Sequence, residues 1–384
     1  MRRSSVRSGG EECILVLQGG GALGSYQAGV YEALATQGAG PHWVAGISIG
    51  AINSALIAGN ASGDRVTRLR DFWELVSSAM PDLLLEVDGR WRASLNEASA
   101  MQAVLLGVPG FFAPRVPPPP FHPDGSVGAI SYYDTAPLQS TLERLVDFDR
   151  INGGGVRLSI GAVNVRTGNF TYFDSARQRI DVRHIMASAA LPPGFPPVEI
   201  DGEHYWDGGL VSNTPLQYVL DTPGAVHRTV FQVDLFSARG GLPRTMRRVA
   251  EREKDIRFSS RTRLNTDVEL QWRAAAAAAQ RLLARLPPKW RDDPDAQALS
   301  RLRPACSGLD IVQLIYRSKR HEQHSKDYEF SRWTMREHWE AGRSDVFLTL
   351  SDPRWSGRKA GSAKVRVFDL SEATRSDSEL EQAA

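Results

Sequence analysis

The chain has very little cysteine and almost no charge imbalance. Its 384 residues include 2 cysteines, Cys13 and Cys306, and 46 basic residues oppose 44 acidic ones for a formal net charge of +2. The cysteines lie far apart without metal-ligand spacing, so we expect reduced thiols, although their positions do not exclude a disulfide. Because the charges are balanced, the net charge of the chain does not indicate a nucleic-acid partner, and we expect none.

Long apolar runs are also missing. No stretch approaches the roughly 20 apolar residues of a membrane span. The basic residues 1–7 are not followed by the apolar run of a signal peptide, because Glu11 and Glu12 come first. We therefore expect a cytoplasmic protein, with peripheral membrane contact left open. No cluster has the spacing of a metal site, so we expect no metal and no cofactor. Nothing in the sequence indicates the oligomeric state.

Short apolar runs alternate with helical periodicity in the first part of the chain. Residues 13–17 form a continuous apolar run next to glycines, which predicts a buried parallel strand. A helix is expected over residues 25–36, a second strand over 42–45, and a second helix, rich in small residues, over 49–58. This alternation predicts an α/β fold with right-handed crossovers.

Residues 81–128 interrupt this pattern. The four consecutive prolines at 117–120 exclude a helix or a central strand there. The segment is an insertion, and it is either a lid over a site or a surface loop whose apolar residues pack down. The apolar residues in question are Val104, Leu105, Leu106, Val108, Phe111 and Phe112.

The second half predicts further strands and a long helical stretch. Strands are expected at 156–165, 170–173, 227–236 and 310–316, with the second pairing to the first as a hairpin. Helices are expected at 184–190, 244–285 and 330–341. We expect a first domain over residues 13–236, a helical connector over 237–289, a C-terminal domain over 290–360 and a polar tail over 361–384.

A basic cluster lies within the predicted connector. Its cations suit anionic lipid head groups, but interleaved acidic residues favour a solvated helix face. The basic residues are Arg244, Arg247, Arg248, Arg252, Lys254 and Arg257, and the acidic residues are Glu251, Glu253 and Asp255.

A glycine-rich loop follows the first strand. Gly19, Gly21 and Gly24 form a G-x-G-x-x-G pattern that opens a helix. Such a loop can hold a pyrophosphate or the oxyanion of a tetrahedral acyl intermediate. A dinucleotide site needs an acidic residue about 20 positions further on. The second strand instead runs into residues 46–48 without a carboxylate, which favours the oxyanion.

Residues 46–50, Gly-Ile-Ser-Ile-Gly, match G-x-S-x-G between a strand and a helix. This is the context of a nucleophile elbow, in which a tight turn exposes a serine hydroxyl. Gly46 and Gly50 keep side chains out of the turn. Ser48 is therefore the candidate nucleophile, and the N–H of Ile49 is a candidate oxyanion donor.

A serine hydroxyl is a weak nucleophile and needs a base to take its proton. None of the eight histidines lies where a triad hydrolase would place one. Asp207 follows an aromatic pair and precedes Gly208 and Gly209, which would let its carboxylate approach Ser48. A plain Asp-Gly turn is the alternative interpretation of Asp207 taken alone.

Together the three motifs, in this order, resemble the patatin-like phospholipases. Residues 186–197 resemble the family too, and the resemblance covers roughly residues 13–236. It implies a three-layer α/β/α fold with a mostly parallel central sheet, plus a smaller C-terminal α/β extension. Residues 290–360 resemble a domain appended to some bacterial members. One departure is Leu23, where many relatives carry Arg or Lys.

The resemblance implies a lipid acyl hydrolase with a Ser48–Asp207 dyad and an acyl lipid as substrate. Asp207 would take the proton of Ser48, and the N–H groups of Gly20, Gly21 and Ile49 would hold the oxyanion. The whole set expected around the oxyanion is Gly19, Gly20, Gly21, Gly24 and Ile49. Two other hypotheses remain. The chain is a non-catalytic lipid-binding or scaffold relative, or a nucleotide-binding protein that uses residues 19–24.

Overall fold

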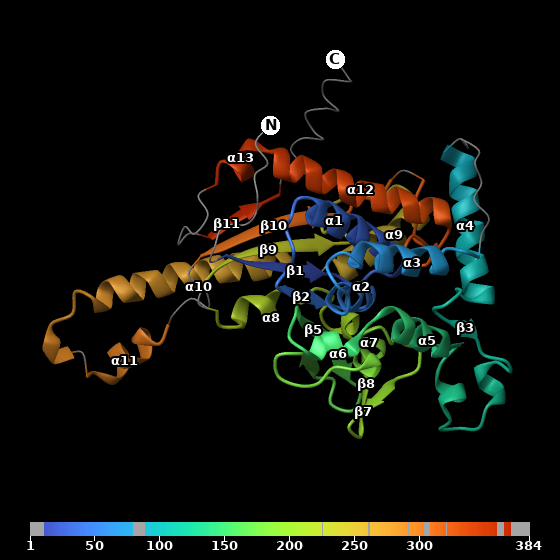
Figure 1. The fold of residues 1–384 in the computed structure, drawn as a ribbon, viewed down its shortest axis with the longest axis horizontal. Coiled ribbons are helices and arrows are strands. Elements are labelled where there is room, and N and C mark those ends of the chain that lie inside the picture. The colour runs from blue at the N-terminus through green and yellow to red at the C-terminus, as the bar shows by residue number, and fades with distance from the viewer. Residues whose placement is uncertain are drawn as a thin grey trace, which may run out of the picture.

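The computed structural model describes residues 11–79, 89–224, 226–259, 262–290, 292–302, 308–319, 321–358 and 365–369. Within these residues a nine-stranded sheet has the order β11-β10-β9-β1-β2-β5-β8-β7, with β6 paired to β5 (Figure 1). Its strands are β1 (Glu11–Leu17), β2 (Trp43–Gly46), β5 (Arg157–Asn164), β6 (Phe170–Asp174), β7 (Val198–Ile200), β8 (Glu203–Asp207), β9 (His227–Asp234), β10 (Leu309–Ile315) and β11 (Val365–Phe368). Strands β3 (Ala113–Pro114) and β4 (Tyr133–Asp134) form a separate pair.

The central sheet is mostly parallel. From β11 through to β5, every neighbouring pair is parallel, whereas β6 and β8 are antiparallel to β5 and β7 is antiparallel to β8. Alternate residues of β1 enter different cores: Leu15 and Leu17 join one, and Ile14 and Val16 join the other. Burial on both faces explains the unbroken apolar run. The predicted α/β fold with a mostly parallel central sheet is confirmed.

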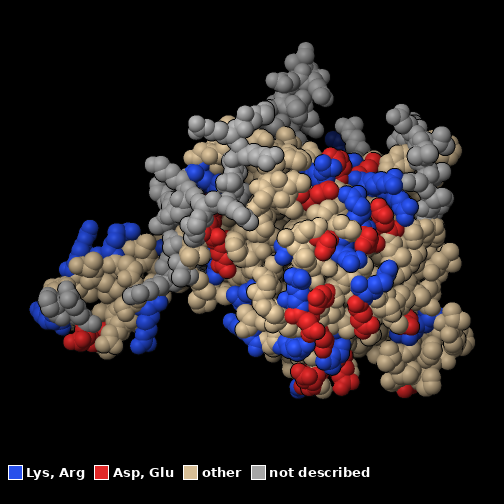
Figure 2. All heavy atoms as spheres, viewed as in Figure 1, with Lys and Arg blue, Asp and Glu red and all other residues tan. Residues whose placement is uncertain are grey.

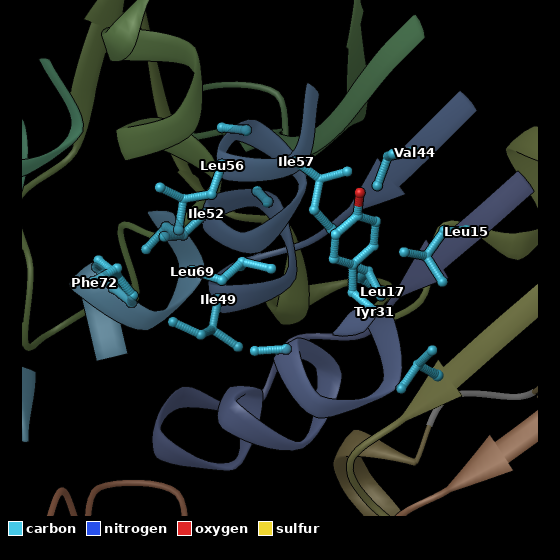
Figure 3. Packing of buried hydrophobic residues seen from close by; sticks show 14 of the residues in the cluster. Leu15, Leu17, Tyr31, Val44, Ile49, Ile52, Leu56, Ile57, Leu69 and Phe72 are labelled. Atoms are coloured by element: carbon cyan, nitrogen blue, oxygen red, sulfur yellow. The ribbon is translucent and has the colours of Figure 1, made fainter. Parts of the chain in front are cut away.

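Helices cover both faces of the sheet. One face is covered by α1 (Ser25–Thr36), α2 (Ile49–Ala58), α3 (Arg65–Val76) and α12 (Arg332–Ser351), whose apolar residues share a core with β1. Figure 3 shows side chains of β1, β2 and these first helices meeting in that core. The opposite face is covered by α8 (Leu216–Asp221), which contacts α10 (Thr262–Leu283). The other helices are α4 (Gly89–Leu106), α5 (Ala136–Leu145), α6 (Phe148–Asn152), α7 (Val182–Ser188), α9 (Met246–Phe258), α11 (Pro294–Ser300) and α13 (Pro353–Ser356).

The predicted elements of the first half are found close to their expected bounds. Helices α1 and α2 span the predicted residues, and β2 begins one residue later than expected. The predicted hairpin is the antiparallel pair β5–β6. Further along, the helical stretch expected at 244–285 contains two helices, α9 and α10.

The predicted insertion contains regular structure that the sequence analysis missed. Helix α4 occupies residues 89–106, while residues 80–88 lie outside the described part of the chain. Val108, Phe111 and Phe112 are buried, so this part of the insertion packs down as one of the two hypotheses expected. Leu105 and Leu106 at the end of α4 remain exposed.

The described strands of the C-terminal region, β10 and β11, continue the same sheet. Strand β10 pairs in parallel with β9, and α12 packs along α1. A Cβ on Gly29 of α1 would lie 1.9 Å from the carbonyl oxygen of Trp339, and one on Gly342 would lie 2.1 Å from that of Tyr26. These glycines let the two helix backbones approach closely. The predicted boundary near residue 236 therefore does not coincide with a break in the sheet, and the other domain bounds stay predictions.

The predicted polar tail over 361–384 includes the described residues 365–368. These form β11, which pairs in parallel with β10 at the edge of the sheet. Val365 packs against the core that contains Ile14 and Val16, Phe368 joins the core that contains Leu15 and Leu17, and Arg366 binds Asp310. Residues 370–384 lie outside the described part of the chain.

Surface charge is mixed on the face drawn in Figure 2. Lys and Arg are interspersed with Asp and Glu over this face, and no large area of one sign is seen on it. Within the described residues, no helix combines the length and apolar character needed to span a membrane.

Candidate active site

Ser48 sits in a strained turn between β2 and α2. Its φ of 56° is in the left-handed region, which residues other than glycine rarely adopt. Ser48 is the N-cap residue of α2, yet its hydroxyl makes no capping hydrogen bond. A non-glycine residue held in this conformation is typical of a nucleophile elbow. The hydroxyl is thus presented at the start of a helix and left available for chemistry.

The glycines of the turn are required by close backbone packing. A Cβ on Gly46 would lie 2.3 Å from the carbonyl oxygen of Gly50, and one on Gly50 would lie 2.3 Å from that of Leu17. A side chain at Gly46 would collide with the start of α2, and one at Gly50 would collide with the end of β1. The G-x-S-x-G spacing therefore follows from the geometry of the turn.

Asp207 ends strand β8 and is buried beside Ser48. Its Oδ1 accepts a hydrogen bond from the N–H of Gly209 at 2.7 Å. A Cβ on Gly208 would lie 2.7 Å from the carbonyl oxygen of Gly161, and one on Gly209 would lie 3.1 Å from Asp207 Oδ1. Gly208 is therefore needed for the close approach of the two backbones, whereas a side chain at Gly209 would crowd the carboxylate.

Burial makes Asp207 an unusually weak acid. Desolvation raises its pKa from 3.8 to about 7, while hydrogen bonding from the Ser48 side chain and from Gly209 opposes that rise. Among the described residues, no cation forms an ion pair with Asp207. A carboxylate with a pKa near neutrality is suited to accept a proton from a hydroxyl and return it.

The glycine-rich loop leads from β1 into α1 beside Ser48. Gly21 has a φ of 54° and starts a short 3-10 turn. The N–H groups of Gly20, Gly21 and Ile49 have no protein acceptor in the described part of the chain. Gly20, Gly21 and Ile49 all line the same cavity as Ser48. Free N–H groups at helix starts suit a developing negative charge.

Gly19 and Gly24 differ from the other glycines expected around the oxyanion. The N–H of Gly19 donates to the carbonyl oxygen of Asn213 at 3.1 Å, so it is already used. A Cβ on Gly24 would lie 2.5 Å from Ile49 Cγ1 and 2.9 Å from the ring of Trp73. Gly24 does not line the cavity. These two glycines shape the loop, and neither offers a free N–H to the site.

Two polar residues that the sequence analysis did not single out hold the motifs together. Ser188 accepts a hydrogen bond from the N–H of Ser48 at 3.0 Å and donates one to the carbonyl oxygen of Gly161 at 2.7 Å. Asn213 donates to the carbonyl oxygens of Gly19 at 3.0 Å and Phe258 at 2.9 Å. Both side chains are buried. Ser188 falls in the run 186–197 that resembles the family, whereas Asn213 had no such signal.

Ser48 and Asp207 open onto a cavity of about 330 Å³. Its walls are mainly apolar, and several aromatic rings in it contact one another, as Phe112 does with Tyr133 and Phe195. The insertion and the C-terminal region both contribute to the walls. The apolar and aromatic lining residues include Ala103, Val104, Phe111, Phe112, Tyr133, Leu191, Phe195, Phe236, Phe258, Tyr328 and Phe330. None of these described lining residues is a histidine, so Asp207 is the candidate base.

One group of metal-type side chains lies at the opposite edge of the sheet. The ligand atoms of Glu11, His227 and Asp310 lie within 4.8 Å of one another. Asp310 is already bound by two guanidinium groups, that of Arg366 at 2.6 and 2.7 Å and that of Arg358 at 3.3 Å. The guanidinium groups thus already occupy the oxygens of Asp310 that a metal ion would need.

Comparisons with known proteins give a family for the chain. A family model described as patatin-like phospholipase matches residues 15–220, and one described as patatin phospholipase matches residues 256–361. The first match contains all three motifs around Ser48 and Asp207. No curated protein matches the chain.

Two solved structures are similar over parts of the chain. The crystal structure of VipD from Legionella pneumophila has a TM-score of 0.35 and 14% identity, and the match covers 88% of this chain and 66% of that one. Human GIVD cytosolic phospholipase A2 has a TM-score of 0.31 and 13% identity, with 58% of this chain and 42% of that one covered. The chain thus spans less than two thirds of either.

Proposed function

The chain belongs to the patatin-like phospholipase family, and we propose that it hydrolyses acyl esters of lipids with a Ser48–Asp207 dyad. The observation that carries this proposal is the buried carboxyl of Asp207, which lines the same apolar cavity as the hydroxyl of a strained Ser48 and has a pKa raised to about 7 by burial. One site thus holds a nucleophile, a base whose pKa lies near neutrality, and a cavity that suits an acyl chain.

The proposed reaction has two steps. Asp207 takes the proton of Ser48 as the hydroxyl oxygen attacks the ester carbonyl, and the N–H groups of Gly20, Gly21 and Ile49 stabilise the oxyanion. The alcohol part of the lipid leaves with a proton from Asp207. Water, deprotonated by Asp207, then hydrolyses the acyl-enzyme and releases the fatty acid. The reaction needs no cofactor.

The cavity supports an acyl chain as the group bound. Its aromatic and aliphatic walls offer dispersion contacts and few hydrogen-bond partners, which suits a hydrocarbon and suits a nucleotide poorly. Leu23, where many relatives carry a cation, is buried, so the anion is stabilised by backbone N–H groups alone.

We also propose that the end of α4 contacts a lipid surface. Val104 lines the cavity and is partly exposed, and the next two residues, Leu105 and Leu106, are 62% and 71% exposed. Exposed leucines that continue an apolar cavity would let a lipid pass from a bilayer to Ser48 without crossing water. The proposed peripheral membrane contact would thus lie at the mouth of the site.

Hydrolysis of a panel of esters and labelling with a fluorophosphonate test the proposal. Wild-type protein should release fatty acid and be labelled at Ser48. Ser48→Ala should lose activity by on the order of 10⁴-fold or more and lose the label. Ser140→Ala is the matched control, because Ser140 is exposed on α5 and far from the three motifs in sequence.

The two alternative hypotheses predict other outcomes. A lipid-binding scaffold would bind fatty acid but release none from any ester, with Ser48 unlabelled. A nucleotide-binding protein would bind a labelled dinucleotide with micromolar affinity and would not respond to acyl esters.

A further inference from the structure

We propose that residues 321–330, which lie within the second family match, are part of the catalytic unit: they form one wall of the acyl cavity and hold the oxyanion loop in place. This inference rests on the proposed function and assigns a role to the C-terminal region. Asp327 is the positioning residue, Lys254 its charge partner, and Phe330 the residue that shapes the cavity.

Asp327 contacts the oxyanion loop through its backbone. Its carbonyl oxygen accepts a hydrogen bond from the N–H of Ala22 at 2.8 Å. A Cβ on Gly21 would lie 2.0 Å from the same oxygen, so the loop and the C-terminal segment are in direct contact. Because the Ala22 N–H belongs to the peptide next to the one that carries the Gly21 N–H, this bond restrains the loop that presents the free N–H of Gly21.

Lys254 forms an ion pair with Asp327 and neutralises the negative charge of its side chain. Asp327 lines the cavity that contains Ser48, where its negative charge would repel a developing oxyanion. Lys254 Nζ donates to Asp327 Oδ1 at 2.7 Å and to the carbonyl oxygen of His324 at 2.7 Å. The ion pair therefore balances the charge and ties the segment to α9.

A second ion pair anchors the same segment without touching the cavity. Lys326 Nζ donates to Asp255 Oδ1 at 2.6 Å and to Ser318 Oγ at 2.7 Å. The side chains of Lys254 and Asp255 are mostly buried, at 12% and 14% exposure. The solvated helix face predicted for α9 is therefore wrong at these two positions, where the helix faces residues 324–327.

The aromatic residues of the segment complete the cavity wall. Phe330 is buried and its ring lies 5.9 Å from that of Phe111 in the insertion. Tyr328 lines the cavity beside Phe330, and Lys254 Nζ lies 5.1 Å from the centre of the Tyr328 ring. The insertion and the C-terminal region thus meet across the acyl site, and the size of residue 330 limits the space for a chain.

The charge balance is tested with a double variant of the full chain, assayed with a short-chain ester. Lys254→Met should lower kcat roughly tenfold, because Asp327 is left uncompensated. Lys254→Met/Asp327→Asn should recover most of that loss, and Lys254→Arg should keep most of the activity. Lys326→Met should lower kcat less than Lys254→Met. Arg179→Met, which removes an exposed ion pair with Asp149, is the matched control and should be unchanged.

A merely structural role gives a different pattern. In that case Lys326→Met and Lys254→Met would lower kcat equally. Adding Asp327→Asn would then not restore the kcat of Lys254→Met. That pattern would overturn the proposed charge balance.

The cavity wall is tested by chain-length preference. Phe330→Trp should lower kcat/KM for a lauroyl ester relative to an acetyl ester by roughly tenfold, because the larger ring narrows the cavity. Phe121→Trp is the control, since Phe121 is 75% exposed and outside the cavity wall. An unchanged ratio in an active, Ser48-labelled Phe330→Trp protein would overturn this inference and leave the proposed function intact. An inactive, unlabelled wild type would overturn the proposed function, and this inference with it.

Discussion

At the carboxyl edge of the central sheet Asp207 is buried with no cation paired to it among the described residues, whereas at the amino edge Asp310 is buried against Arg358 and Arg366. The two carboxyls lie in one sheet and are equally inaccessible to water. At the amino edge, paired strands bring opposite charges face to face, as in the register of Asp310 with Arg366. At the carboxyl edge, the unpaired Asp207 has a pKa raised to about 7.

The difference between the two edges is that a paired carboxyl suits a stabilising role and an unpaired carboxyl suits a reactive one. A buried carboxylate that is fully paired holds strands together. An unpaired one is costly to keep charged and is therefore ready to accept a proton. Of the two edges, only that of Asp207 also carries the glycine-rich turns and the apolar cavity.

The largest effect should come from removing the unpaired carboxyl. Asp207→Asn keeps the shape of the side chain but cannot accept the proton of Ser48, so we expect kcat/KM to fall by on the order of 10⁴-fold. Steady-state ester hydrolysis measures it. Asp149→Asn is the control, because Asp149 is exposed and pairs with Arg179 only at the surface. Retention of full activity by Asp207→Asn would show that the base is another group.

Removing the paired carboxyl should lower stability and spare chemistry. Asp310→Asn leaves the guanidinium groups of Arg358 and Arg366 without their shared partner, so we expect the free energy of unfolding to fall by about 3 kcal/mol. Chemical denaturation measures the loss, and the folded variant should hydrolyse esters like wild type. The comparison between the two edges fails if this variant is as stable as wild type.

The pH dependence should expose the raised pKa of Asp207. Only the charged form is a base, so kcat/KM should fall about tenfold for each pH unit below 7 and level off above it. The folded pKa lies above the ordinary value of 3.8, so the folded protein binds this proton more tightly. Wild type should therefore lose stability relative to Asp207→Asn as pH rises from about 4 to about 7, which thermal melts can measure. Flat profiles would contradict burial of an unpaired carboxyl.

The smallest effect concerns the lipid surface. Leu105→Ser/Leu106→Ser removes two exposed apolar side chains from the mouth of the cavity, so binding to phosphatidylcholine vesicles should weaken roughly tenfold. Sedimentation with vesicles measures it, and hydrolysis of a short soluble ester should be unchanged. Leu282→Ser on α10 is the matched control, with 57% exposure. Equal loss in both proteins would contradict a docking site at α4.

Local signals in the sequence predicted the first half of the fold well. The apolar run of β1, the small-residue helix α2 and the turn at Ser48 each depend on neighbouring residues, so their spacing is enough to identify them. Strand β8 was missed even though a local signal was present. Asp201 and Gly202, with φ of 52° and 81°, form the turn between β7 and β8, and Asp-Gly is a strong hairpin signal.

The sequence by itself determined the three motifs, their order, and the α/β alternation that brings the ends of β1 and β2 together. Only the tertiary structure decided that β10 and β11 extend the same sheet. It also decided that Asn213 and Ser188 form hydrogen bonds with the two turns, and that Asp327 forms one with Ala22. The physical reason is distance along the chain. A turn is set by the steric demands of adjacent residues, whereas a cavity wall forms from segments whose proximity only the packed sheet establishes.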